Sequence, residues 1–167
     1  MTDKIGSDVL RLERQVCLTL AVASREVVTL YRPLLEPLGL THPQYLVMVA
    51  LWEADGPLSI RQLSQLLTLE APTLSPLLKR LENNGFVERR RDPSDARSLW
   101  VGLTEQGDAL RERAADVPPA LLLRLGMTIP ELRTLRDALN GVIEHAATAQ
   151  DQGAQDQEAQ DQGARTG

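Results

Sequence analysis

The sequence holds one cysteine, two histidines and few aromatic residues among its 167 residues. A single cysteine, Cys17, excludes an internal disulfide and is typical of a protein kept in a reducing compartment. Charged residues interrupt every apolar stretch well before the ~18 residues that a membrane-spanning helix needs. The N-terminus also lacks the apolar segment of a signal peptide. We therefore expect a cytoplasmic protein without a membrane partner.

Sequence signals of catalysis are also missing. No Cys/His cluster has the spacing of metal ligands, and neither a phosphate-binding loop nor a G-x-S-x-G motif occurs. We expect no metal, no cofactor and no enzymatic activity. Leucine and alanine are abundant and aromatic residues make up 3% of the chain, so the core should be mostly helical and aliphatic.

Positive charge is scarce overall but concentrated in one segment. The formal net charge is −5, yet residues 79–97 contain six basic and four acidic residues and carry +2, which leaves −7 for the rest. A local basic surface on an acidic protein is what binding to phosphate groups requires. The alternative is that these arginines only form a solvated face.

The basic segment belongs to a recognisable pattern over residues 58–103. Two short helix patterns precede Gly85, and two strand-like runs, 86–91 and 98–103, flank a charged turn. This order predicts a winged helix-turn-helix, a module that reads DNA. The predicted fold class is mainly α with a small β-wing, with a DNA-reading lobe at about 41–103 and dimerisation helices on both sides.

The second helix of this module should run from about Pro72 to Asn83 or Asn84, with Pro76 in its first turn. Leucines form its buried stripe, and polar and basic residues form the opposite face that would enter a major groove. In the wing, Arg97 is placed to enter a minor groove and Asp95 to orient it. The candidate DNA-binding residues are Thr73, Ser75, Lys79, Arg80, Arg89, Arg91, Asp95 and Arg97.

The flanking segments have apolar residues at helical spacing. Helices are expected at about 7–37 and, with a stop near Pro118-Pro119, at about 104–148. Both are apolar along one side, so they predict a homodimer interface. Three capping boxes mark helix starts, at Thr41/Gln44, Ser59/Gln62 and Thr128/Glu131.

Both ends of the chain differ from this middle part. Residues 1–6 are predicted to be flexible. Residues 149–167 repeat a five-residue motif rich in Asp, Gln and Ala without large apolar side chains, which predicts a disordered acidic tail. The compact domain is therefore expected to span residues 7–148.

The chain resembles the MarR family of transcriptional repressors. Residues 95–107 are similar to the family's D-x-R…LT-x-x-G signature. A closer resemblance is to the single-cysteine, organic-hydroperoxide-sensing OhrR group, carried by segments 15–18, 24–26, 31–35, 41–46 and 51–53. The resemblance implies a homodimer that binds an operator with inverted-repeat symmetry in double-stranded DNA.

The same resemblance gives Cys17 a redox-sensing role with organic hydroperoxides as effectors. In this group an N-terminal cysteine is oxidised, and tyrosines that reach the cysteine support its thiolate. Tyr31 matches one of them, whereas His42 stands where the group has a second tyrosine. His42 could donate a hydrogen bond or, if protonated, supply a charge. Without a second cysteine, a low-molecular-weight thiol could cap the oxidised sulfur as a mixed disulfide.

Helix geometry limits how these residues meet. Cys17 and Tyr31 are 14 residues apart, or ~21 Å along one straight helix. They can only touch if Tyr31 comes from the partner subunit, with the two helices antiparallel. The sensor would then lie across the dimer interface.

Two other functions stay open. The chain could be a MarR-type repressor released by a small phenolic or aromatic ligand, with Cys17 incidental. It could also be an enzyme that consumes peroxide, although a DNA-binding wing argues against that. Cys17 as an inert apolar residue, Tyr31 as a core aromatic and His42 as a surface residue are the corresponding structural alternatives.

Overall fold

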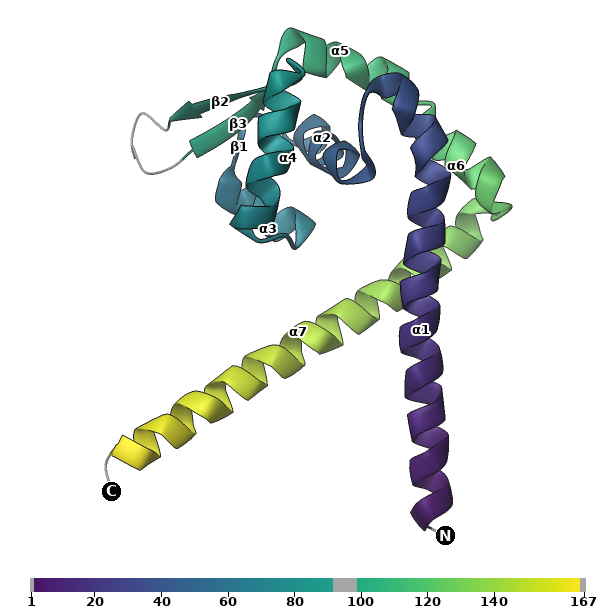
Figure 1. Cartoon of the computed structure of the whole chain (residues 1–167), viewed down its shortest axis with the longest axis vertical. Coiled ribbons are helices and arrows are strands. Elements are labelled where there is room, and N and C mark those ends of the chain that lie inside the picture. The colour runs from purple at the N-terminus through teal and green to yellow at the C-terminus, as the bar shows by residue number, and fades with distance from the viewer. Residues whose placement is uncertain (1, 92–98, 166–167) are drawn as a thin grey trace. The chain divides into compact units, whose positions relative to one another are not determined.

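A computed structural model describes residues 2–91 and 99–165, and it contains two compact units, Met1–Leu125 and Gly126–Gly167. The described helices and strands of the first unit are drawn in Figure 1. They are α1 (Thr2–Leu35), the 3₁₀ helix η1 (Glu36–Leu38), α2 (His42–Glu53), β1 (Leu58–Ser59), α3 (Ile60–Leu67), α4 (Ala71–Asn83), β2 (Val87–Arg91), β3 (Leu99–Leu103), α5 (Glu105–Ala114) and α6 (Val117–Leu125). The second unit consists of α7 (Ile129–Arg165).

The predicted winged helix-turn-helix is confirmed. Strands β2 and β3 form the antiparallel wing hairpin, and β1 pairs with the other edge of β3, giving the order β1-β3-β2. The sequence did not predict β1, which is only two residues long and exists through its pairing with β3. The expected wing tip, with Asp95 and Arg97, lies outside the described residues.

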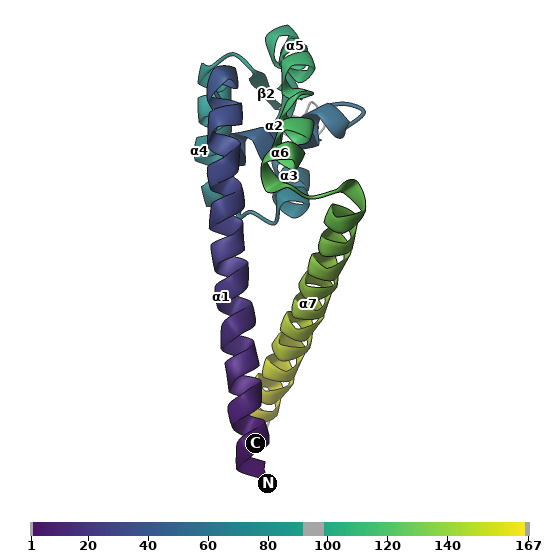
Figure 2. The same ribbon diagram turned by 90° about the vertical axis from the view of Figure 1, so that its right-hand side faces the viewer.

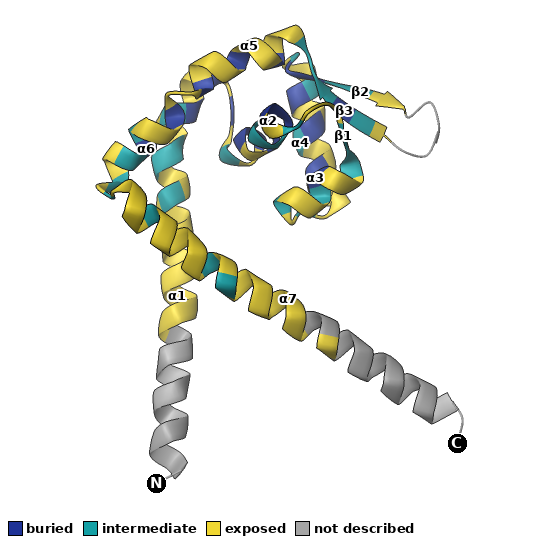
Figure 3. Cartoon of the chain, turned by 180° about the vertical axis from the view of Figure 1, so that it is seen from behind, coloured by how far each residue is buried: buried dark blue, intermediate teal, exposed yellow. Residues whose placement is uncertain are grey.

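The core lies where α2, α3, α4 and the sheet meet (Figure 3). The largest fully buried side chains there include Met48, Leu63, Leu74, Leu78, Leu81 and Val101. Leucines at positions 74, 78 and 81 recur every three or four residues, so one face of α4 is buried in the core. The opposite face of α4 is thereby fixed toward solvent.

All three predicted capping boxes are present. The Oε1 atom of Gln44 accepts a hydrogen bond of 2.8 Å from the backbone N–H of Thr41, and Gln62 accepts one of 2.9 Å from Ser59. In the second unit the carboxylate of Glu131 accepts from the backbone N–H of Thr128 at 2.8 Å. These contacts satisfy backbone donors at the helix starts and therefore fix where α2, α3 and α7 begin.

Two proline positions differ in detail from the sequence-based prediction. The helix that opens at Thr104 ends at Ala114, a few residues before the expected stop near Pro118-Pro119, and the two prolines lie in the first turn of a new helix, α6, where the N–H that proline lacks would have no helical partner. Pro76 lies inside α4 rather than in its first turn. Pro76 is exposed on the face opposite the leucine stripe. Burial of that stripe stabilises the helix although Pro76 interrupts its backbone hydrogen bonds.

The termini also differ from expectation. Helix α1 begins at Thr2, where the sequence predicts a flexible end, and α7 continues to Arg165 through the segment predicted to be disordered. Alanine and glutamine have high intrinsic helix propensity. None of the described helices is long and apolar enough to cross a membrane.

Within the first unit, the C-terminal part of α1 packs against α6, which runs beside it (Figure 2). Residues 15–26 of α1, in contrast, are exposed throughout. They include Val16, Leu18, Leu20 and Val22, whose large apolar side chains are 37–61% exposed. An apolar helix surface of this kind is what the predicted dimer interface would cover.

Candidate functional site

The surface of α4 matches the predicted DNA-reading face. Thr73, Ser75, Lys79 and Arg80 are all exposed, whereas the leucine stripe on the other side is buried. Short polar side chains occupy the N-terminal half and the two basic side chains follow one turn later. This arrangement suits a recognition helix whose start enters a major groove.

The wing arginines differ from one another in their surroundings. The Nε atom of Arg89 donates a 3.0 Å hydrogen bond to the Oε2 atom of Glu82, and the Nη2 atom donates to the same oxygen. Arg89 therefore links β2 to α4, a role that the sequence did not indicate. Arg90 pairs with Glu88 at 2.7 Å on the exposed surface, and Arg91 is exposed at the end of β2.

Glu82→Gln is expected to lower the free energy of unfolding by about 0.5 kcal/mol at pH 7, as for a partly exposed ion pair. The hydrogen bond from Arg89 lowers the pKa of the Glu82 carboxyl. The stabilisation is therefore complete above the carboxyl's unfolded-state pKa of ~4.3 and is lost as the pH falls through the lower folded-state value. Urea unfolding at pH 7 and pH 3 measures both.

Glu88→Gln is the matched control, because its pair with Arg90 is more exposed, with 75% of the Arg90 side chain accessible. It should change stability little at either pH. An equal loss for Glu82→Gln at both pH values would contradict an electrostatic role of the Glu82–Arg89 pair.

Cys17 is exposed on α1 and lies far from its predicted partner in the same chain. Helix α1 is continuous from Thr2 to Leu35, so Tyr31 is ~21 Å further along the same axis. The two residues therefore cannot touch within one chain, and the prediction that two subunits share the sensor depends on this separation.

Tyr31 and His42, the other two predicted redox-site residues, are in contact. Their ring centroids are 4.6 Å apart, and the ring of Tyr45 lies 5.8 Å from that of Tyr31 in a tilted arrangement. Burial raises the pKa of Tyr31 and lowers the pKa of His42. Near pH 7 both side chains are therefore neutral. They can donate hydrogen bonds, but they supply no positive charge.

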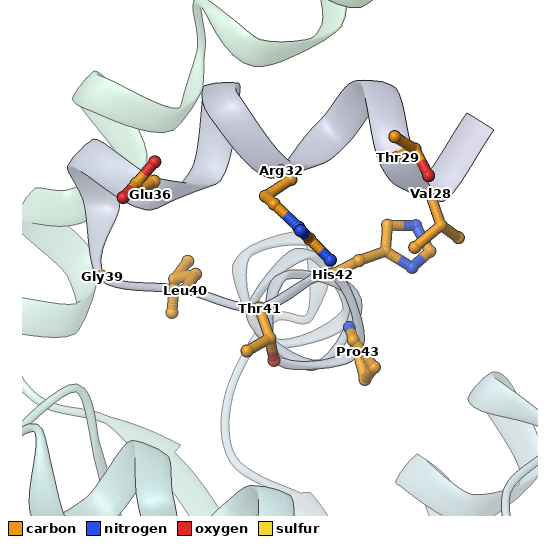
Figure 4. Close-up of a pocket in the computed structure, with 9 residues that line it drawn as sticks. All are labelled: Val28, Thr29, Arg32, Glu36, Gly39, Leu40, Thr41, His42 and Pro43. Carbon is orange, nitrogen blue, oxygen red and sulfur yellow. The ribbon is translucent and has the colours of Figure 1, made fainter. Parts of the chain in front are cut away.

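His42 also lines a pocket of about 530 Å³ between the end of α1 and the start of α2. Residues from both sides line it: Val28, Thr29, Arg32, Glu36 and Gly39–Pro43. Figure 4 shows the Arg32 side chain directed toward His42, with Glu36 one helical turn further away. The pocket thus has a cationic group beside His42.

The aromatic contacts continue from this pocket toward the wing. Tyr45 and Trp52 are 6.4 Å apart on α2, and the Nε1 atom of Trp52 donates a 2.9 Å hydrogen bond to the carbonyl of Gly107. Gly107 lies in the first turn of α5, directly after β3. The sequence did not indicate a role for Arg32 or Trp52, or the ring contacts of Tyr45. Their shared helix faces, Tyr45 and Trp52 being seven residues apart, could have indicated that they lie together.

The spacing of Thr104 and Gly107 after β3 has a structural reason. The Thr104 side chain accepts a 3.0 Å hydrogen bond from the Gly107 N–H and caps α5. Its hydroxyl donates to the carbonyl of Gly85, the left-handed residue after α4. Thr104 therefore connects the ends of the recognition helix and the wing. Among the described residues no group of three or more His, Cys, Asp or Glu side chains could hold a metal ion.

The sequence profile of the MarR family matches residues 40–99, which comprise most of the winged module. Over 137 residues the chain is 39% identical to the organic hydroperoxide resistance transcriptional regulator of Bacillus subtilis, covering 82% of this chain and 92% of the relative. The chain belongs to the MarR family. As a member of this family it is a DNA-binding transcriptional regulator and not an enzyme.

Solved MarR-type structures agree with this assignment. Reduced AbfR bound to DNA superposes with a TM-score of 0.72 at 32% identity, covering 85% of this chain and 98% of that chain. The disulfide-formed structure of AbfR, a protein of Staphylococcus epidermidis, superposes with a TM-score of 0.59 over 84% and 98%. AbfR is thus a regulator of this fold whose structure is known both reduced on DNA and with a disulfide formed.

Proposed function

We propose that this MarR-family protein is a repressor that senses organic hydroperoxides through oxidation of Cys17 and then releases its operator. The observation that carries the proposal is the placement of Cys17 and the Tyr31–His42 contact on one continuous helix and the start of the next. Within one chain the thiol and the two hydrogen-bond donors are too far apart to react together. In a homodimer with antiparallel α1 helices, Cys17 of each subunit lies beside Tyr31 and His42 of the other, which gives two equivalent sites.

The chemistry needs the thiolate form of Cys17. Its sulfur attacks the terminal hydroxyl oxygen of the hydroperoxide, an S–O bond forms and the O–O bond breaks. The electron pair leaves with the alkoxide, which takes a proton and becomes an alcohol. The cysteine becomes a sulfenic acid, oxidised by two electrons, and the hydroperoxide is reduced by two. Tyr31 and His42 act as neutral donors that hydrogen-bond the thiolate or the peroxide oxygens.

The sulfenic acid needs a further reaction to persist, because the chain contains no second cysteine. A low-molecular-weight thiol can condense with it, forming a mixed disulfide and water. The added group would lie in the dimer interface and bias the spacing of the two recognition helices. Oxidation is thereby converted into loss of DNA binding.

The test combines an operator-release titration with mass spectrometry of the same samples. Cumene hydroperoxide should release the wild-type dimer in proportion to the fraction of Cys17 oxidised, and a small thiol should convert the oxidised form into a mixed disulfide. If Cys17 becomes fully oxidised and the protein stays on its operator with and without the thiol, the proposal is wrong.

A second candidate rests on the pocket beside His42. Its volume of about 530 Å³ is within the range for small-molecule sites, so a phenolic or aromatic ligand could release the repressor with Cys17 incidental. A phenolic compound would then release the wild type and a Cys17→Ser variant equally. Peroxide would release neither.

For DNA, Arg97→Ala is expected to weaken operator binding and to reduce the slope of log affinity against log salt concentration by about one unit, since one phosphate-region contact is lost. Fluorescence anisotropy over a series of salt concentrations measures the slope. Arg97→Lys is the matched control and should keep it. An unchanged slope for Arg97→Ala would place this arginine away from the DNA.

The operator itself should be an inverted repeat with half-sites about one helical turn, ~10 bp, apart. This spacing follows from the two-fold symmetry of the proposed dimer. Footprinting of the bound dimer would show it as two protected segments on one face of the duplex.

A further inference from the structure

We propose that Arg32 is the positive charge that stabilises the thiolate of the partner subunit's Cys17. The inference rests on the proposed function and assigns a role to a residue that neither the sequence pattern nor the Tyr31–His42 contact explains. It concerns one end of the pocket between α1 and α2, where Arg32 and His42 lie together (Figure 4).

The first step is the absence of charge on the two expected donors. Tyr31 is half-buried and neutral, and burial lowers the pKa of His42, so its imidazole is neutral near pH 7. A thiol with ordinary surroundings has a pKa of ~8.5 and is mostly protonated at pH 7. Hydrogen bonds stabilise the thiolate, and a nearby cation stabilises it further. A source of positive charge beside the neutral pair is therefore the remaining requirement for a reactive sensor.

The second step is that Arg32 is the cation available there. Among the residues that line the pocket, the permanently charged side chains are Arg32 and Glu36. Within the part of the chain that the structure describes, Arg32 has no hydrogen-bond or ion-pair partner, Glu36 included. Its side chain is directed toward His42, and Glu36 lies about one turn further along the chain, at the start of η1. The charge of Arg32 is thus not neutralised by a neighbouring carboxylate.

The third step is how a thiol arrives at this position. In an antiparallel pair of helices, moving one residue toward the C-terminus on one helix corresponds to moving one residue toward the N-terminus on the other. If Tyr31 of one subunit faces Cys17 of the partner, then Arg32 faces the level of the residue before that cysteine. Arg32 therefore lies within one residue of the thiol along the helix axis, ~1.5 Å. A side chain as long as that of arginine easily spans the remaining distance.

Arg32→Gln is the test, with the pH dependence of Cys17 alkylation by iodoacetamide as the readout. Cys17 is the sole cysteine of the chain, so all alkylation reports on it. The variant should raise the thiol pKa by about one unit, as for loss of one cation within ~4–6 Å. Below that pKa the alkylation rate should fall about threefold, because the smaller thiolate fraction is partly offset by a more nucleophilic thiolate.

Two matched variants separate charge from packing. Arg32→Lys should retain most of the shift, because it keeps the charge. Glu36→Gln, one turn away in the same pocket, should not raise the thiol pKa. Arg32 is exposed, and circular dichroism and operator affinity of the reduced protein should stay at wild-type values for all three variants. An unchanged thiol pKa in Arg32→Gln overturns the proposal.

A heterodimer shows whether the charge acts across the interface. One subunit carries Cys17→Ser and Arg32→Gln, and its wild-type partner contributes the single thiol. That thiol should have the raised pKa, whereas it should be normal when Cys17→Ser and Arg32→Gln are on opposite subunits. The reverse result overturns the assignment to the partner subunit.

Failure of the proposed function gives a different result. If peroxide does not release the wild-type dimer, sensing fails whatever the thiol pKa is. If Arg32→Gln instead weakens binding of salicylate, a phenolic carboxylate, and leaves the thiol pKa unchanged, the arginine recognises a ligand and the thiolate proposal is wrong.

Discussion

Cys17→Ser is expected to bind the operator with wild-type affinity and to stay bound at a cumene hydroperoxide concentration that fully releases the wild-type dimer. Serine keeps the approximate size of the side chain but cannot form a sulfenic acid. Cys17 is exposed in the single chain and belongs to α1 rather than to the recognition helix α4, so the reduced protein should lose little stability and no DNA contact. Anisotropy titrations before and after peroxide measure the effect.

The expected difference is large because the proposed release depends entirely on modification of Cys17. A hundredfold loss of operator affinity corresponds to about 2.7 kcal/mol, and a bulky group on Cys17 in a packed interface can supply it. In the variant that contribution is zero. Tyr31→Phe is a matched comparison, because it retains the thiol and removes one donor, and it should slow the response without abolishing it.

A peroxide response that survives in Cys17→Ser would exclude thiol sensing. Release of both proteins by a phenolic compound, without any peroxide effect, would instead support the ligand-controlled repressor. Consumption of many peroxide equivalents per subunit would contradict the family assignment to a regulator. The three outcomes are distinct, so one set of titrations decides between the functions.

The structure indicates how an event at this site can affect the DNA-reading module. Tyr31 contacts Tyr45, Tyr45 approaches Trp52, and Trp52 is hydrogen-bonded to Gly107 at the start of α5. These contacts lie in one tightly packed unit, in which shifts are transmitted rather than absorbed. They connect the end of α1 to the segment that follows the wing, and double-mutant cycles between Tyr45 and Trp52 would measure the coupling.

Sequence signals that act over three or four residues predicted the structure well. The capping boxes at Thr41, Ser59 and Thr128 and the leucine stripe of α4 are all present, because each depends on contacts within one or two helical turns. The order of helix patterns, glycine and strand-like runs predicted the winged module, and the family resemblance added the proposed sensing role of Cys17. Tyr31 and His42, which the resemblance grouped, do meet within one chain.

Features that depend on distant partners were missed. Strand β1 forms only because residues more than 40 positions later pair with it, and Arg89 turns from the expected DNA surface to Glu82 on α4. Pro118 was read as a helix stop because a proline in a first turn and a proline after a helix look alike in sequence. The position of Arg32 beside His42 was not predicted, because it depends on how the end of α1 and the start of α2 pack together.

Gly107→Ala is expected to destabilise the winged unit by about 3 kcal/mol, at the upper end of the range for overpacking a close contact. A Cβ atom at this position would lie 1.9 Å from the carbonyl oxygen of Phe86 and 2.8 Å from its carbonyl carbon. Both are backbone atoms, and that oxygen already accepts a hydrogen bond from the N–H of Thr104. The methyl group can therefore be accommodated only by moving α5 away from the end of α4.

The φ angle of Gly107 is not in the left-handed region, so the close approach alone requires glycine. Gly141→Ala is the control, since that glycine is also helical and has no atom within 4 Å of the added Cβ. It should be stabilising by about 0.5–1 kcal/mol, the normal result in a helix. Thermal unfolding at one subunit concentration should show Gly107→Ala lower by about 10 °C. A similar gain for both variants would mean that α5 does not hold the close contact with Phe86 in solution, and the connection from Trp52 through Gly107 to the wing would lose its basis.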